Sequence, residues 1–99
     1  MSDFSYMGRS ITLSGDGDKD SPFVIKGTGW NPALAAELER YVAGKYFNGR
    51  TWSIARTRTE QDENHRQLSV LTLKVLWDHD EVVETDMWFD ITEAMNRVP

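Results

Sequence analysis

Two strand-forming runs separated by a short acidic segment constrain the fold of this chain more than any other feature. Leu68–Trp77 and Val82–Thr92 are rich in β-branched, aromatic and leucine residues, a pattern typical of a β-hairpin. Because side chains alternate along a strand, each run has one apolar face. The inner-face residues are Leu71, Leu73, Val75 and Trp77 in the first run and Val83, Thr85, Met87, Phe89 and Ile91 in the second.

Only an odd-length loop brings both apolar faces to the same side of the sheet. A five-residue loop, Asp78–Val82, places Trp77 opposite Val83, Leu73 opposite Met87 and Leu71 opposite Phe89. The same register sets Lys74 opposite Asp86 on the outer face, which is a favourable cross-strand pair.

The rest of the chain supplies three further strands and two helices. Asn31-Pro32 suits a helix start, because asparagine accepts the free N–H groups of the first turn and proline fits the first helical position. Asp90 and Glu93 resemble a capping box, with Glu93 reaching back toward the cap. The expected elements are strands over Arg9–Ser14, Phe23–Lys26 and Thr51–Arg58, a long helix from Asn31 to Phe47, and a short helix after Asp90.

This order predicts an α+β fold. We expect an antiparallel sheet of about five strands, in the order β-β-α-β-β-β-short α, with the long helix packed on one face. Residues 1–99 form a single domain, and residues 1–8 are expected to be a loose N-terminal arm. No cysteine, signal peptide or apolar run of membrane-spanning length occurs, which favours a soluble cytoplasmic protein.

The net charge of −5 is unevenly distributed. Residues 1–59 hold eight Lys/Arg against six Asp/Glu, whereas residues 60–99 hold three against ten. Such a surface repels phosphate backbones and disfavours nucleic acid as a partner. The acids between 78 and 93 form either a solvated face or a surface that meets a basic protein partner. They are Asp78, Asp80, Glu81, Glu84, Asp86, Asp90 and Glu93.

Trp88 alternates onto the same outer face as Glu84, Asp86 and Asp90. Tryptophan is enriched at protein interfaces, so an exposed Trp88 among acids could anchor a partner. The alternative is that the N-terminal arm or the last helix covers it. The predicted partner-binding residues are therefore Trp88, Glu84, Asp86, Asp90, Asp78, Asp80 and Glu81.

Aspartates alternate in the segment Asp16-Gly17-Asp18-Lys19-Asp20, as they do at the start of many calcium loops. Ser21 and Gly27 then occupy the places of the glycine and the bidentate glutamate of an EF-hand. The segment is therefore either an ordinary aspartate-rich turn or a metal site made by Asp16, Asp18 and Asp20.

Motifs for catalysis are missing from the sequence. It contains no Gly-x-Ser-x-Gly, no cysteine nucleophile and no phosphate-binding loop, so we expect no enzyme and no cofactor.

Gly15-Asp16-Gly17 with Ser21-Pro22, Trp52, and Phe89-Asp90-Ile91-Thr92 resemble motifs of a family of small bacterial proteins. Members of that family carry Gly-Asp-Gly-Ser-Ser before an Ile-Val-Ile strand and end in Tyr-Phe-Asp-Ile-Thr. The resemblance spans residues 15–92 and departs at Asp18-Lys19 and at Trp88. It implies the same fold and a bacterial or phage origin, and it implies no activity.

These observations predict a small acidic protein-binding module, of the inhibitor or immunity type, acting on a protein with a basic surface. A homodimer is also compatible with the sequence. The alternative function is a calcium- or metal-binding regulatory module that uses Asp16, Asp18 and Asp20.

Overall fold

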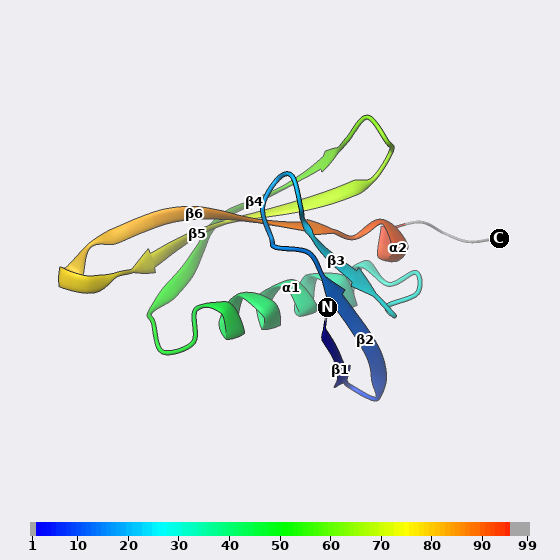
Figure 1. Ribbon diagram of the computed structural model, residues 1–99, viewed down its shortest axis with the longest axis horizontal. Coiled ribbons are helices and arrows are strands. Elements are labelled where there is room, and N and C mark those ends of the chain that lie inside the picture. Colours follow the sequence, from blue (N-terminus) through cyan, green and yellow to red (C-terminus); the bar gives the residue numbers. More distant parts are fainter. Residues whose placement is uncertain (1, 96–99) are drawn as a thin grey trace.

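The computed structural model describes residues 2–95 as one six-stranded sheet with a long helix on one face (Figure 1). The strands are β1 (Ser2–Tyr6), β2 (Arg9–Ser14), β3 (Phe23–Lys26), β4 (Trp52–Gln61), β5 (Gln67–Leu76) and β6 (Val82–Asp90). The helices are α1 (Pro32–Tyr46), α2 (Thr92–Met95) and a 3-10 turn, η1 (Asp78–Asp80). The α+β class is confirmed.

The sheet order is β1-β2-β3-β6-β5-β4, and the sheet is mixed. The predicted meander of β4, β5 and β6 is antiparallel, as expected. The prediction of a purely antiparallel sheet of five strands is wrong, because β3 runs parallel to β6. This pairing follows from α1, which carries the chain from β3 to the far edge of the sheet and lets the meander return to β3.

The N-terminal segment is a strand and was wrongly predicted as a loose arm. β1 pairs with β2 through a two-residue turn, in which Met7 and Gly8 both have positive φ, as favoured hairpin turns require. The rings of Phe4 and Tyr6 lie 5.4 and 5.2 Å from that of Tyr41 on α1. These ring contacts hold β1 against the body of the protein.

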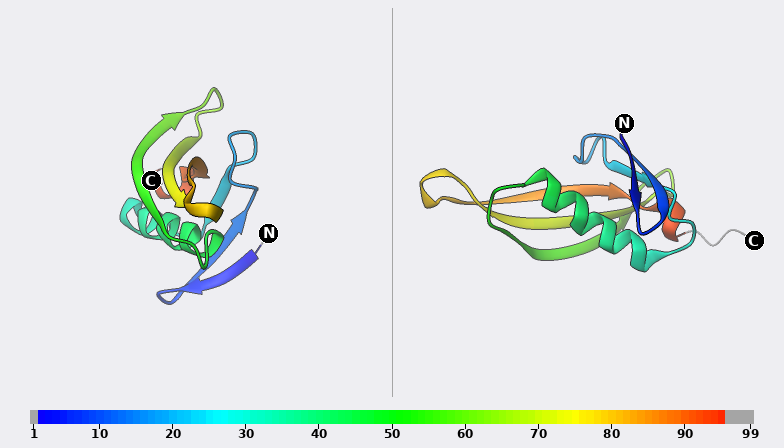
Figure 2. Two further views of the ribbon diagram at one scale, coloured as in Figure 1. Left: turned by 90° about the vertical axis from the view of Figure 1, so that its left-hand side faces the viewer. Right: turned by 90° about the horizontal axis from the view of Figure 1, so that it is seen from below.

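Helix α1 begins and ends where the sequence predicts. Asn31 Oδ1 accepts a hydrogen bond from Leu34 N at 3.0 Å, and Pro32 takes the first helical position. The helix buries Leu34, Leu38 and Val42 against the inner face of the sheet. The sheet curls around the helix, as the end-on view shows (Figure 2). The other core side chains are Ile11, Phe23, Ile25, Ala35, Ala43, Phe47, Leu71, Leu73, Val75, Met87, Phe89, Ile91 and Ala94.

The β5–β6 hairpin has the predicted faces but a different register. Leu73 pairs with Thr85, Val75 with Val83, and Lys74 with Glu84, so each partner is two residues earlier in β6 than expected. The five-residue connection is Trp77–Glu81, because His79 and Asp80 adopt left-handed φ values of 60° and 59°. Since the connection starts at Trp77, this residue leaves the core and is 42% exposed.

The molecule is elongated, with principal extents of 51 × 32 × 22 Å. The tip of the β5–β6 hairpin projects beyond the end of α1 in both side views (Figures 1 and 2). Within residues 2–95, no helix is long and apolar enough to cross a membrane.

Candidate functional site

Two adjoining hollows lie along the inner face of β6, at the C-terminal end of α1. Both are lined by Tyr46, Phe47 and Thr85. The first, the loop hollow, has a volume of about 240 Å³ and is completed by Asp16, Gly17, Asp18, Phe23, Asp86 and Met87. The second, the tip groove, has a volume of about 300 Å³ and is completed by Trp77 and Val83. Together they form a strip from the 15–22 loop to the tip of the hairpin.

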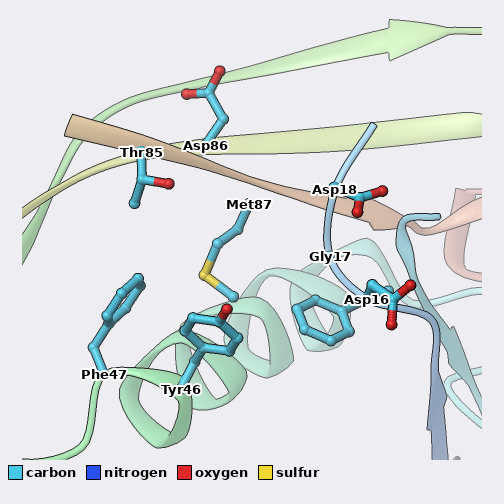
Figure 3. A pocket seen from close by; sticks show the side chains of 9 residues that line it. Asp16, Gly17, Asp18, Tyr46, Phe47, Thr85, Asp86 and Met87 are labelled. Atoms are coloured by element: carbon cyan, nitrogen blue, oxygen red, sulfur yellow. The ribbon is translucent and has the colours of Figure 1, made fainter. Parts of the chain in front are cut away.

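The loop hollow combines aromatic rings with the aspartates of the 15–22 loop, and most of its lining surface is polar (Figure 3). Thr85 and Met87 point from β6 toward Tyr46 and Phe47, whereas the Asp86 carboxylate points to the opposite side of the sheet (Figure 3). On that side, Asp86 accepts a hydrogen bond from Thr72 Oγ1 at 2.7 Å. The side chain of Asp86 therefore belongs to the outer face, and the acidic residues that remain at the hollow are Asp16 and Asp18.

The loop that bears Asp16, Asp18 and Asp20 is closed by its own hydrogen bonds. Asp16 N and Gly17 N both donate to Ser21 O at 2.9 Å, and Ser21 N donates to Asp18 Oδ1 at 2.7 Å. Gly17 has a φ of +87°, and a side chain there would overlap the ring of Phe23. This geometry is that of an aspartate-capped turn. Within residues 2–95, no three His, Asp or Glu side chains gather as metal ligands would, so the predicted metal residues are not brought together.

The tip groove carries large apolar side chains in contact with solvent. Tyr46 is 63% exposed and Trp77 is 42% exposed. The Tyr46 ring packs edge-on against Phe47 at 4.9 Å, and the Trp77 ring lies 3.7 Å from the guanidinium carbon of Arg50. Arg50 also pairs with Asp78 at 3.4 Å. Arg50 therefore packs over the indole ring, and its ion pair with Asp78 favours this position.

Three of the predicted partner residues lie beside the tip groove. Asp78, Asp80 and Glu81 are all exposed in the Trp77–Glu81 connection. Asp78 is partly neutralised by Arg50, whereas Asp80 and Glu81 make no ion pair with any described residue. The tip of the hairpin therefore combines exposed aromatic surface with uncompensated negative charge.

The predicted anchor, Trp88, is not exposed. It is 8% exposed and forms a small outer-face cluster with Leu68 and Val70. Arg58 and Lys19 lie 5.3 and 6.0 Å from the centre of its ring, and the backbone N–H of Trp88 donates to Gly17 O at 2.8 Å. Neither the N-terminal arm nor the last helix is the cover. The 15–22 loop and Arg58 cover Trp88, because the sheet brings both against β6.

The remaining predicted partner acids are engaged within the protein. Glu84 pairs with Arg56 at 2.6 Å, and Asp86 lies 3.9 Å from Arg58. Both arginines come from β4, which precedes the acidic half of the chain. Asp90 is buried, and its Oδ1 accepts from Thr92 N at 3.0 Å as a cap of α2. On the outer face of β6, the acids Glu84 and Asp86 are thus paired with arginines, and Trp88 is covered.

Glu93 does not reach back to Asp90, in contrast to the capping-box prediction. Its carboxylate accepts hydrogen bonds from Gly27 N at 3.0 Å and from Gly29 N at 3.1 Å. Both glycines have positive φ, which turns their N–H groups toward Glu93. A carboxylate from α2 thereby holds the segment between β3 and α1.

The sequence analysis also missed a buried acid. Glu39 on α1 is 5% exposed, and Oε1 accepts a hydrogen bond from the buried hydroxyl of Ser69 on β5. Burial raises the pKa of Glu39 to about 7, although the Ser69 hydrogen bond and the charge of Arg40 act in the opposite direction. The helical spacing could have predicted this burial, because Glu39 lies four residues after Ala35 and three before Val42, on the apolar side of the helix.

Comparison of the sequence with protein-family models and curated proteins, and of the fold with solved structures, found no match.

Proposed function

We propose that this protein acts by binding a protein partner with a basic surface, through the tip groove and the acids beside it. One observation carries the proposal: Tyr46 and Trp77 stand exposed around a groove of about 300 Å³, next to Asp80 and Glu81. An inhibitor or immunity-type protein of bacterial or phage origin, working in the cytoplasm without catalysis, fits this arrangement and the small acidic chain.

The tip groove has the composition of a protein-binding surface. Tryptophan and tyrosine carry much of the energy at interfaces, because they bury a large apolar area with few rotatable bonds. Arg50 and Phe47 already fix Trp77 and Tyr46, so little side-chain entropy is lost when a partner covers them.

The acids favour a basic partner. Asp80 and Glu81 are exposed in the connection between β5 and β6, whose tip projects beyond the end of α1 (Figure 1), so their charge is accessible to an approaching surface. Charges at the rim of an interface mainly steer association and select partners. Nucleic acid does not fit this proposal, because the same field repels phosphate.

Affinity capture from the native host, followed by binding kinetics with the captured protein, tests the proposal. Trp77→Ala is expected to weaken binding by about 30-fold, equivalent to about 2 kcal/mol, while the fold survives. Met7→Ala is the matched control, because Met7 is 78% exposed and lies in the β1–β2 turn. Asp80→Lys is expected to slow association at low salt and to have little effect at high salt. Equal binding by Trp77→Ala and the wild type would refute the proposal.

The alternative, a metal-binding loop, has a direct test. The hydrogen bond from Ser21 N already occupies Asp18, so millimolar calcium is expected to leave the melting temperature unchanged. A rise of several degrees in the wild type that is lost in Asp16→Asn would favour the alternative.

A further inference from the structure

A third hollow, the α1–β4 hollow, opens between α1 and the inner face of β4 and β5. Its volume is about 250 Å³. Its walls include Glu39 and Arg40 from α1, Thr57 and Thr59 from β4, and Ser69 from β5. It shares no lining residue with the tip groove, so an inference about it is independent of the proposed function.

The two carboxylate oxygens of Glu39 differ in their surroundings. Oε1 accepts from Ser69 Oγ, whereas Oε2 receives no hydrogen bond from a described residue. Because no fully buried side-chain oxygen among the described residues lacks a partner, Oε2 still reaches solvent. Arg40 contributes a favourable charge but forms no ion pair with Glu39 within the described part of the chain. A carboxylate that is 5% exposed and bound by one hydroxyl has lost most of its hydration without full replacement.

The other walls complete the chemistry of a small site. Thr57 and Thr59 lie on the inner face of an edge strand that α1 does not cover, and both are exposed. Their hydroxyl groups make no hydrogen bond to the described residues, so they are available to a ligand. Leu71 and Ile91 supply buried apolar surface beside them.

We propose that the α1–β4 hollow binds a primary ammonium group on a short alkyl chain, with Glu39 Oε2 as the acceptor. Oε2 can accept a hydrogen bond from a donor that enters the hollow, and a positively charged donor forms the stronger bond to a carboxylate with little water around it. Leu71 and Ile91 face the alkyl chain, and the hydroxyls of Thr57 and Thr59 accept the remaining N–H groups.

The size of the hollow agrees with this ligand. A closed apolar cavity of about 150 Å³ in another protein admits benzene, so about 250 Å³ has room for an alkylamine of several carbon atoms. The ammonium group can belong to a free alkylamine or to a lysine side chain, and the two sources share the same chemistry.

Nuclear magnetic resonance titration of the whole protein tests the proposal. The probes are n-butylamine, which is protonated at about pH 8, 1-butanol as the uncharged control of the same length, and Nα-acetyl-lysine methylamide. Butylammonium is expected to give saturable shifts at the amides of Thr57, Thr59 and Ser69. It is also expected to lower the titration midpoint of the Glu39 carboxyl by about one to three pH units, because a nearby cation favours the ionised form.

Two variants distinguish this site from nonspecific binding. Glu39→Gln keeps the shape and the Ser69 hydrogen bond, and is expected to weaken butylammonium binding at least tenfold, whereas Met7→Ala leaves it unchanged. Thr59→Val is expected to weaken it less. Binding of the lysine amide with similar affinity would identify a lysine side chain as the source, and binding of butylammonium alone would identify a free amine. The proposal is overturned if no saturable shift occurs, or if 1-butanol or the Glu39→Gln variant binds equally well.

Discussion

At the scale of single residues, Glu39 makes the stability of the protein depend on pH. Its pKa is about 7 in the folded state and near 4.5 when exposed. The folded protein therefore holds the proton more tightly, and the resulting stabilisation is complete below about pH 4.5 and is lost as the pH rises through 7. The difference corresponds to roughly 3 kcal/mol as an upper limit.

Glu39→Gln is expected to remove this dependence. The amide carries no charge to bury, so the free energy of unfolding is expected to rise by about 1–3 kcal/mol at pH 8 and to change little at pH 5. Urea denaturation at both pH values measures the effect. Glu37→Gln, on the exposed side of the same helix, is the control. An equal change at pH 5 and pH 8 would contradict the assignment.

The sequence predicts exposure poorly at the two tryptophans of the hairpin. Alternation placed Trp77 in the core and Trp88 outside, and the inner and outer faces were assigned correctly. However, Trp77 lies in the connection, whereas Trp88 is covered by Lys19 and Arg58 from distant segments. A period-two pattern gives the face of a residue and contains no information on what covers that face.

At the scale of secondary structure elements, the β5–β6 hairpin carries the centre of the core. Leu73 and Phe89 are both fully buried. Leu73→Ala and Phe89→Ala are each expected to lower the free energy of unfolding by about 3 kcal/mol, because each leaves a cavity under α1. Glu84→Gln is expected to cost less than about 1 kcal/mol, since its pair with Arg56 is half-exposed. Chemical denaturation measures all three, and a silent Leu73→Ala would contradict the burial of Leu73 in the core.

The hairpin shows why faces are easier to predict than partners. The apolar alternation fixes which residues face the helix, and the structure confirms it. The pairing register of β5 with β6 depends on the left-handed backbone conformation of His79 and Asp80. Histidine and aspartate predict that conformation less clearly than glycine does. Strand β1 was not predicted because its own pattern is weak. Gly8 favours a turn, but Ser2–Tyr6 contains only two apolar residues, Phe4 and Tyr6, which is too few to indicate a strand.

At the scale of the whole molecule, the candidate surfaces arise from contacts between distant segments. The tip groove joins α1 to the β5–β6 hairpin, and the α1–β4 hollow joins α1 to the edge of the sheet. Asp78, Asp80 and Glu81 were predicted because they lie close together in the chain. Tyr46 and Glu39 were not predicted, because the strand or hairpin residues that face them, Trp77 and Ser69, are 30 or more residues away.

The short parallel pairing of β3 with β6 divides the sheet into two parts, β1–β3 and β4–β6, that we expect to differ in local stability. Only Phe23–Phe89 and Val24–Asp90 are in register across it, whereas β5 and β6 are paired over nine positions. Local opening is easiest where few backbone hydrogen bonds must break. Amide protons of β1 and β2 are therefore expected to exchange with deuterium well before those of β5 and β6. Uniform exchange across all six strands would contradict this expectation. In such an opening event, residues 2–26 are expected to separate transiently from β6 while the meander that presents Trp77 keeps its shape.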